Sequence, residues 1–209
     1  HNITASPYRE GKGDIVREFS EACRKAGLEF GVYLSPWDRN HPTYGKPEYI
    51  AVYREQMKEL LTGYGPVFEV WLDGANGGTG YYKGKVGPVE ARVPLETRSI
   101  DHTTYYDWPR TWALMRQWQP NMVLLYGYGG ADVRWCGNET GTGNDPCWAT
   151  IDFKLPVQAL FGSNNDGGPG SGFGGLRMGQ RNAPDWSPSE VDVSIRPGWF
   201  WHAHEDNRV

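Results

Sequence analysis

Apolar side chains recur along residues 14–126 with two alternating periods, one typical of helices and the other of short buried strands. In residues 14–26 they recur every three or four positions behind an acidic cap at Asp14 and before a stop at Gly27, which predicts an amphipathic helix. Residues 28–34 (LEFGVYL) form a short, mostly apolar run that ends at Ser35-Pro36, as buried strands do. The pattern therefore predicts a helix followed by a strand.

The same alternation continues twice more. Residues 47–61 predict a second helix with a proline in its first turn, and residues 67–72 (VFEVWL) predict a second strand closed by Asp73-Gly74. Residues 108–118 predict a third helix, and residues 122–126 (MVLLY) a third strand. Such an order predicts parallel strands joined by crossover helices, in an α/β barrel or a doubly wound sheet.

Glycine spacing separates these two folds. Residues 33–36 and 72–75 follow strands but lack the G-x-G-x-x-G spacing of a phosphate loop, which argues against a nucleotide-binding doubly wound sheet. We therefore predict a (β/α)8-like, TIM-type barrel. Because the chain has 209 residues and a complete barrel typically has roughly 250, we expect residues 1–209 to form a partial barrel with no second domain.

The remaining segments are rich in loop-forming residues. Residues 75–107 are too long for an idle connection, so we expect them to contribute to a site. Residues 127–146 and 161–175 are Gly/Asn/Asp-rich and predict loops, whereas residues 191–195 (VDVSI) alternate and predict another strand.

Composition and charge exclude several classes of partner. The 28 Gly and 15 Pro residues make about a fifth of the chain, below the roughly 25 to 30% typical of disorder. A net charge of -4 leaves no basic footprint for nucleic acid or an anionic membrane surface, and no apolar run is long enough to span a membrane. The 10 Trp residues suit stacking on sugars, although aromatic side chains also fill cores.

Cysteine and histidine positions leave several alternatives open. Cys23 lies in a helical pattern, as a buried thiol does, whereas Cys136 and Cys147 flank a loop and are either bridged, in an exported protein, or free. His202 and His204 are either a metal pair or surface residues. No zinc spacing is present, and Asn164, Asn165 and Asp166 match no calcium template. We expect no metal and no cofactor.

Candidate catalytic residues follow the predicted strands, since a parallel barrel carries its active site at the carboxyl ends of the strands. Asp73 ends a strand, lies on the same side as Trp71 and precedes a glycine that leaves its side chain unobstructed. It is either a catalytic carboxylate or a turn aspartate.

A second carboxylate is available in residues 132–139. Glu139 lies near apolar Trp135 and Cys136, whose desolvation would raise the pKa of its carboxyl group. Glycoside hydrolysis needs one ionised and one protonated carboxyl group on either side of the scissile bond. The alternative is a solvated loop glutamate.

Five motifs, in order, resemble the alpha-L-fucosidases of glycoside hydrolase family 29, most closely the branch associated with α-1,3/1,4-linked fucose. They are residues 11–14 (GKGD), 33–39 (YLSPWDR), 69–75 (EVWLDGA), 134–139 (RWCGNE) and 192–200 (DVSIRPGWF). The resemblance implies a retaining hydrolase with a barrel-like catalytic domain that acts on fucosylated glycans. Asp73 matches the family's nucleophile and Glu139 its acid/base.

The same resemblance implies a set of substrate-binding residues. Tyr33 and Trp71 match aromatic residues that line the fucose pocket, and Arg134 matches either a sugar-binding arginine or a salt-bridged loop residue. Trp37 and Trp135 are expected near the site. The resemblance also places the protein in a secreted, periplasmic, lysosomal or vacuolar compartment.

The chain also departs from the family pattern. Family members carry a His-His-Asp-Gly-Phe segment that binds fucose hydroxyls, and this sequence contains no His-His pair. We therefore expect the barrel to be incomplete at its N-terminal strands and at its C-terminus, and a non-catalytic carbohydrate-binding or structural fragment remains the alternative. Sequons at Asn2 and Asn138 permit glycosylation only in a secretory setting, and we expect Asn138 to be unmodified beside Glu139.

Overall fold

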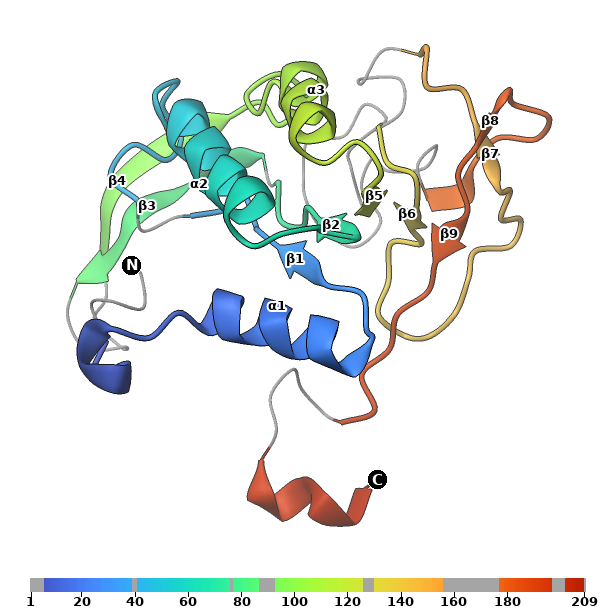
Figure 1. Ribbon diagram of the computed structural model, residues 1–209. Coiled ribbons are helices and arrows are strands. Elements are labelled where there is room, and N and C mark those ends of the chain that lie inside the picture. The colour runs from blue at the N-terminus through green and yellow to red at the C-terminus, as the bar shows by residue number, and fades with distance from the viewer. Residues whose placement is uncertain are drawn as a thin grey trace.

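A three-stranded parallel sheet forms the centre of the computed structural model (Figure 1). The structure describes residues 6–38, 41–75, 77–86, 93–125, 130–155, 177–196 and 202–208, with backbone alone at 78–86, 93–97 and 206–208. The sheet has the order β1 (Gly31–Tyr33), β2 (Glu69–Trp71) and β5 (Val123–Leu125). Helix α2 (Tyr49–Gly63) lies between β1 and β2 in the chain, and α3 (Trp108–Trp118) lies between β2 and β5. The predicted alternation and the parallel pairing are confirmed.

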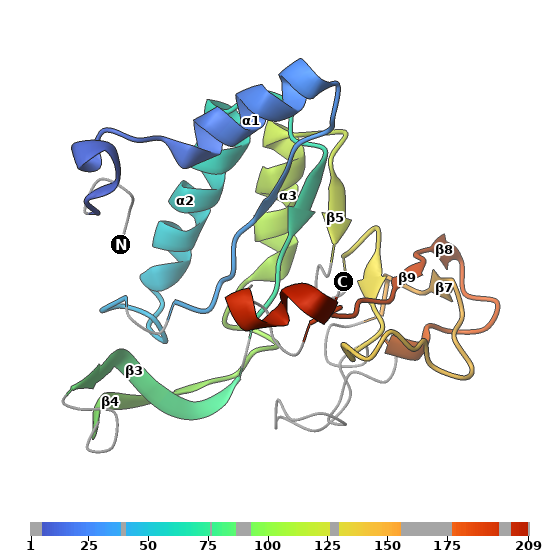
Figure 2. The same ribbon diagram turned by 90° about the horizontal axis from the view of Figure 1, so that it is seen from below.

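The register of the sheet decides which side chains enter the core. Val32, Val70 and Leu124 are partners in one row, and Val70 and Leu124 are fully buried. Helices α2 and α3 lie side by side in both views (Figures 1 and 2) and contribute buried aromatic and apolar residues, among them Tyr49, Tyr53, Met57, Leu61, Trp108 and Met115. Because side chains alternate along a strand, the neighbouring rows face the other side of the sheet.

Helix α1 (Ile15–Ala26) begins and ends as the sequence predicts. The Asp14 carboxylate accepts a 3.0 Å hydrogen bond from the backbone N–H of Arg17, which satisfies one free donor of the first turn. Gly27 ends the helix in the left-handed region, with φ of +69°. The helix packs on the start of β1 through Phe19, whose ring centroid lies 6.3 Å from that of Phe30.

The segment predicted as a long loop, residues 75–107, instead contains a hairpin. Strand β3 (Gly78–Val86) pairs antiparallel with β4 (Val93–Ile100). The prediction was wrong because the glycines of this segment masked its Thr, Tyr and Val residues, which favour extended structure. The hairpin projects to one side of the molecule, opposite the end at which β7 and β8 lie (Figure 2).

Further parallel pairs continue the sheet beyond β5. A parallel bridge joins Leu125 to Val133, directly before β6 (Arg134–Trp135), and β6 pairs parallel with β9 (Ser189–Glu190). The strand predicted at residues 191–195 is therefore misplaced: pairing ends at Glu190, and Val193 forms only an isolated bridge. This order is shared by a barrel wall and by half of a doubly wound sheet, so the barrel stays an expectation.

Shorter elements complete the described fold. Strand β7 (Thr150–Ile151) pairs antiparallel with β8 (Asp185–Trp186), and two 3-10 helices, η2 and η4, span Tyr8–Gly11 and Ala203–Arg208. Within the described ranges, no helix is both long and apolar enough to cross a membrane.

Two glycines with open space around them test the role of backbone conformation at a helix end. A Cβ at Gly27 or at Gly63 would meet no atom within 4 Å, but only Gly27 has a positive φ, of +69°. We predict that Gly27→Ala lowers the free energy of unfolding by about 1 kcal/mol. Gly63→Ala, the matched control, should leave it unchanged or raise it by up to about 1 kcal/mol. Urea denaturation of both variants measures the difference, and equal effects would contradict this explanation.

Candidate active site

Asp73 and Tyr33 meet at the carboxyl edge of the parallel sheet. Tyr33 is the last residue of β1 and Asp73 follows β2 by two residues, and the Tyr33 hydroxyl donates a 2.7 Å hydrogen bond to Asp73 Oδ2. The Tyr33 ring also contacts the Trp71 ring, with centroids 5.9 Å apart and planes tilted by 59°. Since Tyr33 is 55% exposed, this edge carries a carboxylate held by a phenol and flanked by an accessible aromatic surface.

Gly74 explains how the loop after β1 packs beside Asp73. It has φ of +87°, and a Cβ there would lie 2.8 Å from Ser35 Oγ and 3.3 Å from Trp37 Cβ. Only glycine fits both the backbone conformation and this close approach. Trp37, 43% exposed, therefore lies directly beside the residue that follows Asp73, as predicted for a residue near the site.

Glu139 lies on the turn after β6. Its predecessor Asn138 accepts hydrogen bonds at Oδ1 from the backbone N–H of Thr140, at 3.0 Å, and from the Thr140 hydroxyl, at 2.6 Å. Asn138 also donates to the carbonyl of Thr142, at 2.9 Å. These bonds shape the turn and leave the Glu139 side chain exposed.

The causes of the raised pKa of Glu139 include desolvation and the charge of Asp73. Desolvation is the largest cause that raises the pKa of Glu139, and the charges of Asp192 and Asp73 raise it further. Asp73 is thus near enough to disfavour the ionised form of Glu139, although the two residues come from different segments of the chain. The sequence predicted the desolvation but not the role of Asp192.

Arg134 and Trp135 point to opposite sides of β6, as neighbours in a strand do. Arg134 is 2% exposed, and its guanidinium donates to the backbone carbonyls of Ser187, at 2.8 Å, and of Trp148. Trp135 instead donates from Nε1 to Asp192 Oδ1, at 2.9 Å. Trp135 therefore lies on the side of Asp192, whereas the guanidinium of Arg134 holds the backbone of Ser187 and Trp148 on the other side of the strand. The part of Arg134 in sugar binding stays a prediction.

Comparison with known proteins identifies the family. The family model for alpha-L-fucosidase matches residues 2–126, more than half of the chain. The chain belongs to the alpha-L-fucosidase family. Alpha-L-fucosidase 1 of Arabidopsis thaliana is 40% identical over 207 residues, which cover 98% of this chain and 34% of the relative. The crystal structure of a glycoside hydrolase 29 family member from an unknown rumen bacterium matches with a TM-score of 0.74 and 46% identity, over 96% of this chain and 32% of that one. This alpha-L-fucosidase family chain thus spans about a third of these relatives.

Three further acids, which the sequence analysis did not single out as site residues, lie near the candidate site. Burial is the largest cause that raises the pKa of Glu190, followed by the charges of Asp192 and Glu69. Glu69 shares a row with Gly31, whose Cβ, if present, would lie 3.2 Å from that of Glu69. The sequence did hold a signal for these acids, since residues two apart in a strand face the same side. Glu190 and Asp192 are two residues apart, as Glu69 and Trp71 are.

The structure decides between the two alternatives for Cys136 and Cys147. All three cysteines are free: Cys136 is buried and Cys147 is exposed. Among the described residues, no group of three or more His, Cys, Asp or Glu side chains is placed to hold a metal ion. The His202 and His204 rings stack at 5.5 Å. Several residues of the sequence analysis lie outside the described residues, namely Asn2, Arg39, residues 161–175 and residues 197–200.

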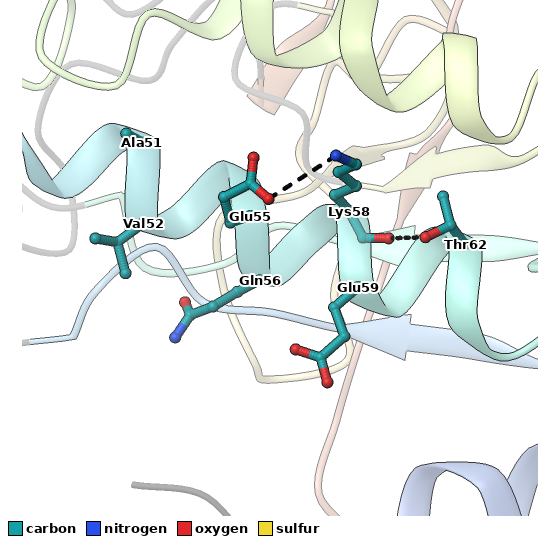
Figure 3. Close-up of a pocket in the computed structure, with 7 residues that line it drawn as sticks. All are labelled: Ala51, Val52, Glu55, Gln56, Lys58, Glu59 and Thr62. Atoms are coloured by element: carbon teal, nitrogen blue, oxygen red, sulfur yellow. Dashed lines mark hydrogen bonds and ion pairs between the residues drawn. The ribbon is translucent and has the colours of Figure 1, made fainter.

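A separate hollow of about 640 Å³ lies along the exposed side of α2 (Figure 3). Its described lining is Ala51, Val52, Glu55, Gln56, Lys58, Glu59 and Thr62. Within it, Lys58 pairs with Glu55 at 3.9 Å, and Thr62 donates to the Lys58 carbonyl at 2.7 Å. No predicted site residue lines it among the described residues, so we place the candidate site at the strand edge.

The fit around Gly74 generates a stability prediction. Gly74→Ala should lower the free energy of unfolding by about 2 kcal/mol, because it combines a positive φ with a contact of 2.8 Å to Ser35 Oγ. Gly143→Ala is the control, since the nearest atom to its Cβ lies 3.9 Å away, and it should change stability by less than about 0.5 kcal/mol. Thermal unfolding of both variants measures the difference; a harmless Gly74→Ala would refute the close approach.

Proposed function

We propose that this chain carries the catalytic carboxylates of a retaining exo-acting alpha-L-fucosidase, with Asp73 as nucleophile and Glu139 as acid/base. The observation that carries the proposal is the position of Asp73 at the carboxyl edge of the parallel sheet, where the Tyr33 hydroxyl holds its carboxylate. Asp73 also lies near enough to Glu139 for its charge, after the larger effect of desolvation, to raise the pKa of Glu139. Membership of the alpha-L-fucosidase family supports it. In the retaining geometry the two carboxyl groups lie about 5 to 5.5 Å apart across the scissile bond.

The proposed reaction has two steps. An Asp73 carboxylate oxygen attacks the anomeric carbon while Glu139 gives its proton to the leaving glycosidic oxygen, which leaves a fucosyl ester on Asp73. Glu139, now ionised, then takes a proton from water, and that water cleaves the ester and releases fucose with retained configuration. The Tyr33 hydroxyl, at 2.7 Å from Asp73 Oδ2, orients the nucleophile.

Each state of Glu139 suits its step. A raised pKa keeps more of the carboxyl group protonated before the first step, as a general acid requires. Once Asp73 is esterified it carries no charge, so one cause of the raised pKa disappears and Glu139 ionises more readily to act as the base. Formation of the ester on Asp73 thus helps Glu139 to change from general acid to general base.

The aromatic residues at this edge suit the sugar. Tyr33 and Trp71 form a tilted pair beside Asp73, against which the apolar C5 methyl group of fucose packs. Trp37 packs against Gly74, and Trp135 ends β6, directly before the turn that carries Glu139. We propose fucosylated oligosaccharides or glycoconjugates as substrates, with α-1,3/1,4 linkage preferred and no cofactor.

We also propose that these residues belong to an incomplete (β/α)8-like barrel in a secreted, periplasmic, lysosomal or vacuolar enzyme. The parallel sheet of β1, β2 and β5 and the parallel pair of β6 and β9 support this architecture, since a parallel bridge from Leu125 to Val133 links them in chain order. In such a barrel the row of Tyr33 and Trp71 would face the interior, at the end that carries active sites.

Substitution of the two carboxylates tests the proposal. We predict that Asp73→Ala and Glu139→Ala each lower the rate of aryl α-L-fucoside hydrolysis by about 10² to 10⁴-fold. Glu59→Ala, an exposed glutamate of α2, is the control and should retain the full rate. Azide should rescue Asp73→Ala with an inverted fucosyl azide and Glu139→Ala with a retained one.

The outcomes separate enzyme from binding module. Equal rates in all three variants would contradict the catalytic assignment. Fucose binding by the unsubstituted chain in a calorimetric titration, without turnover of the aryl fucoside, would favour the non-catalytic alternative.

A further inference from the structure

The turn that carries Glu139 is fastened to one neighbouring segment, residues 188–193. The backbone N–H of Arg134 donates to the carbonyl of Pro188 at 2.8 Å, and that of Cys136 to the carbonyl of Glu190 at 3.0 Å. Gly141 N–H donates to the Asp192 carbonyl at 3.0 Å, and Thr140 bridges Val193. Backbone bonds thus lie on both sides of Glu139 and hold its turn against that segment.

One side-chain bond spans the same two segments. Trp135 Nε1 donates to Asp192 Oδ1 at 2.9 Å, so the Asp192 carboxylate has a fixed position beside the Glu139 turn. An indole N–H needs only an oxygen acceptor, so a neutral acceptor at residue 192 would serve Trp135 equally well. A carboxylate also adds a negative charge next to Glu139. Accepting the Trp135 hydrogen bond does not require that charge.

We propose that Asp192 is a positioning residue for Glu139: held by Trp135, its carboxylate fixes the acid/base turn and disfavours a second negative charge there. The proposal rests on the proposed function, because it assigns Asp192 a role in that same reaction. Asp192 need not touch the sugar, and it acts through Glu139.

The charged groups around Glu139 agree with this role. Asp192 precedes Asp73 among the charges that raise the pKa of Glu139, and desolvation is the largest cause. Asp192 also raises the pKa of Glu190, which faces Glu69 on β2. The cationic side chain of Arg177 packs closely on Gly137, two residues before Glu139, and leaves no room there for a Cβ.

Asp192→Asn and Asp192→Ala separate charge from anchoring. The Asn amide oxygen still accepts the Trp135 hydrogen bond but carries no charge, whereas Ala provides neither. Asp185→Asn is a matched control, since Asp185 also accepts one N–H bond, from Phe153 at 3.0 Å, and is not among the charges that act on Glu139.

The first measurement is the titration of ¹³C-labelled Glu139, whose resonance is assigned from its absence in Glu139→Gln. Both Asp192 variants should lower the pKa of Glu139, because a repelling charge is gone, and Asp185→Asn should not. An unchanged pKa in Asp192→Asn would overturn the proposal. This readout does not need turnover, so it fails or succeeds independently of the proposed function.

The second measurement is the pH profile of kcat/KM for an aryl α-L-fucoside. A general acid loses its proton as pH rises through its pKa, so the alkaline limb should move to lower pH in both Asp192 variants and stay in place in Asp185→Asn. Asp192→Ala should also lose kcat at the optimum relative to Asp192→Asn, because it loses the Trp135 hydrogen bond that joins the turn to residue 192 through side chains. If the wild-type chain is inactive but the Asp192 variants still lower the pKa of Glu139, the proposed fucosidase function is refuted and the effect of Asp192 on Glu139 is not.

Discussion

The in-register parallel pairing of β1 with β2 is the constraint on which the candidate site depends. It places Tyr33 opposite Trp71, so that the Tyr33 hydroxyl reaches the carboxylate of Asp73 two residues beyond the strand. A slip of one residue would turn every side chain to the other face of the sheet. Burial of Val70 and Leu124 in the row between fixes the register, because that slip would expose both to water. The apolar core thus determines the position of Asp73.

The second carboxylate depends on a different kind of contact. Glu139 reaches the site through the bridge from Leu125 to Val133 and the short strand β6, then a turn shaped by side-chain hydrogen bonds. The charges of Asp192 and Asp73 disfavour the ionised form of Glu139 there, after the larger effect of desolvation. Clusters of like charges are unfavourable for stability and are characteristic of functional sites.

Much of this arrangement could be predicted from the sequence, since it is local. The three helices and three strands follow from apolar periodicity and caps such as Asp14 and Gly27, and Asp73 follows from its place after a strand. The hairpin of β3 and β4 was missed, because its pairing is a tertiary property that glycines obscure. The orientation of Arg134 and Trp135 could not be predicted either. A two-residue strand carries no periodicity, so the sequence does not tell which of the two side chains faces Asp192.

The central claim is that Asp73 is the nucleophile and that Glu139 acts as the general acid and then as the general base. Trapping of the covalent intermediate tests this most directly: the protein is incubated with a 2-deoxy-2-fluoro-α-L-fucosyl fluoride, digested and analysed by mass spectrometry. The account predicts one fluorofucosyl ester, on the peptide that contains Asp73 and on that side chain. An ester on any other carboxylate, or turnover of this chain with inversion of configuration, would contradict it.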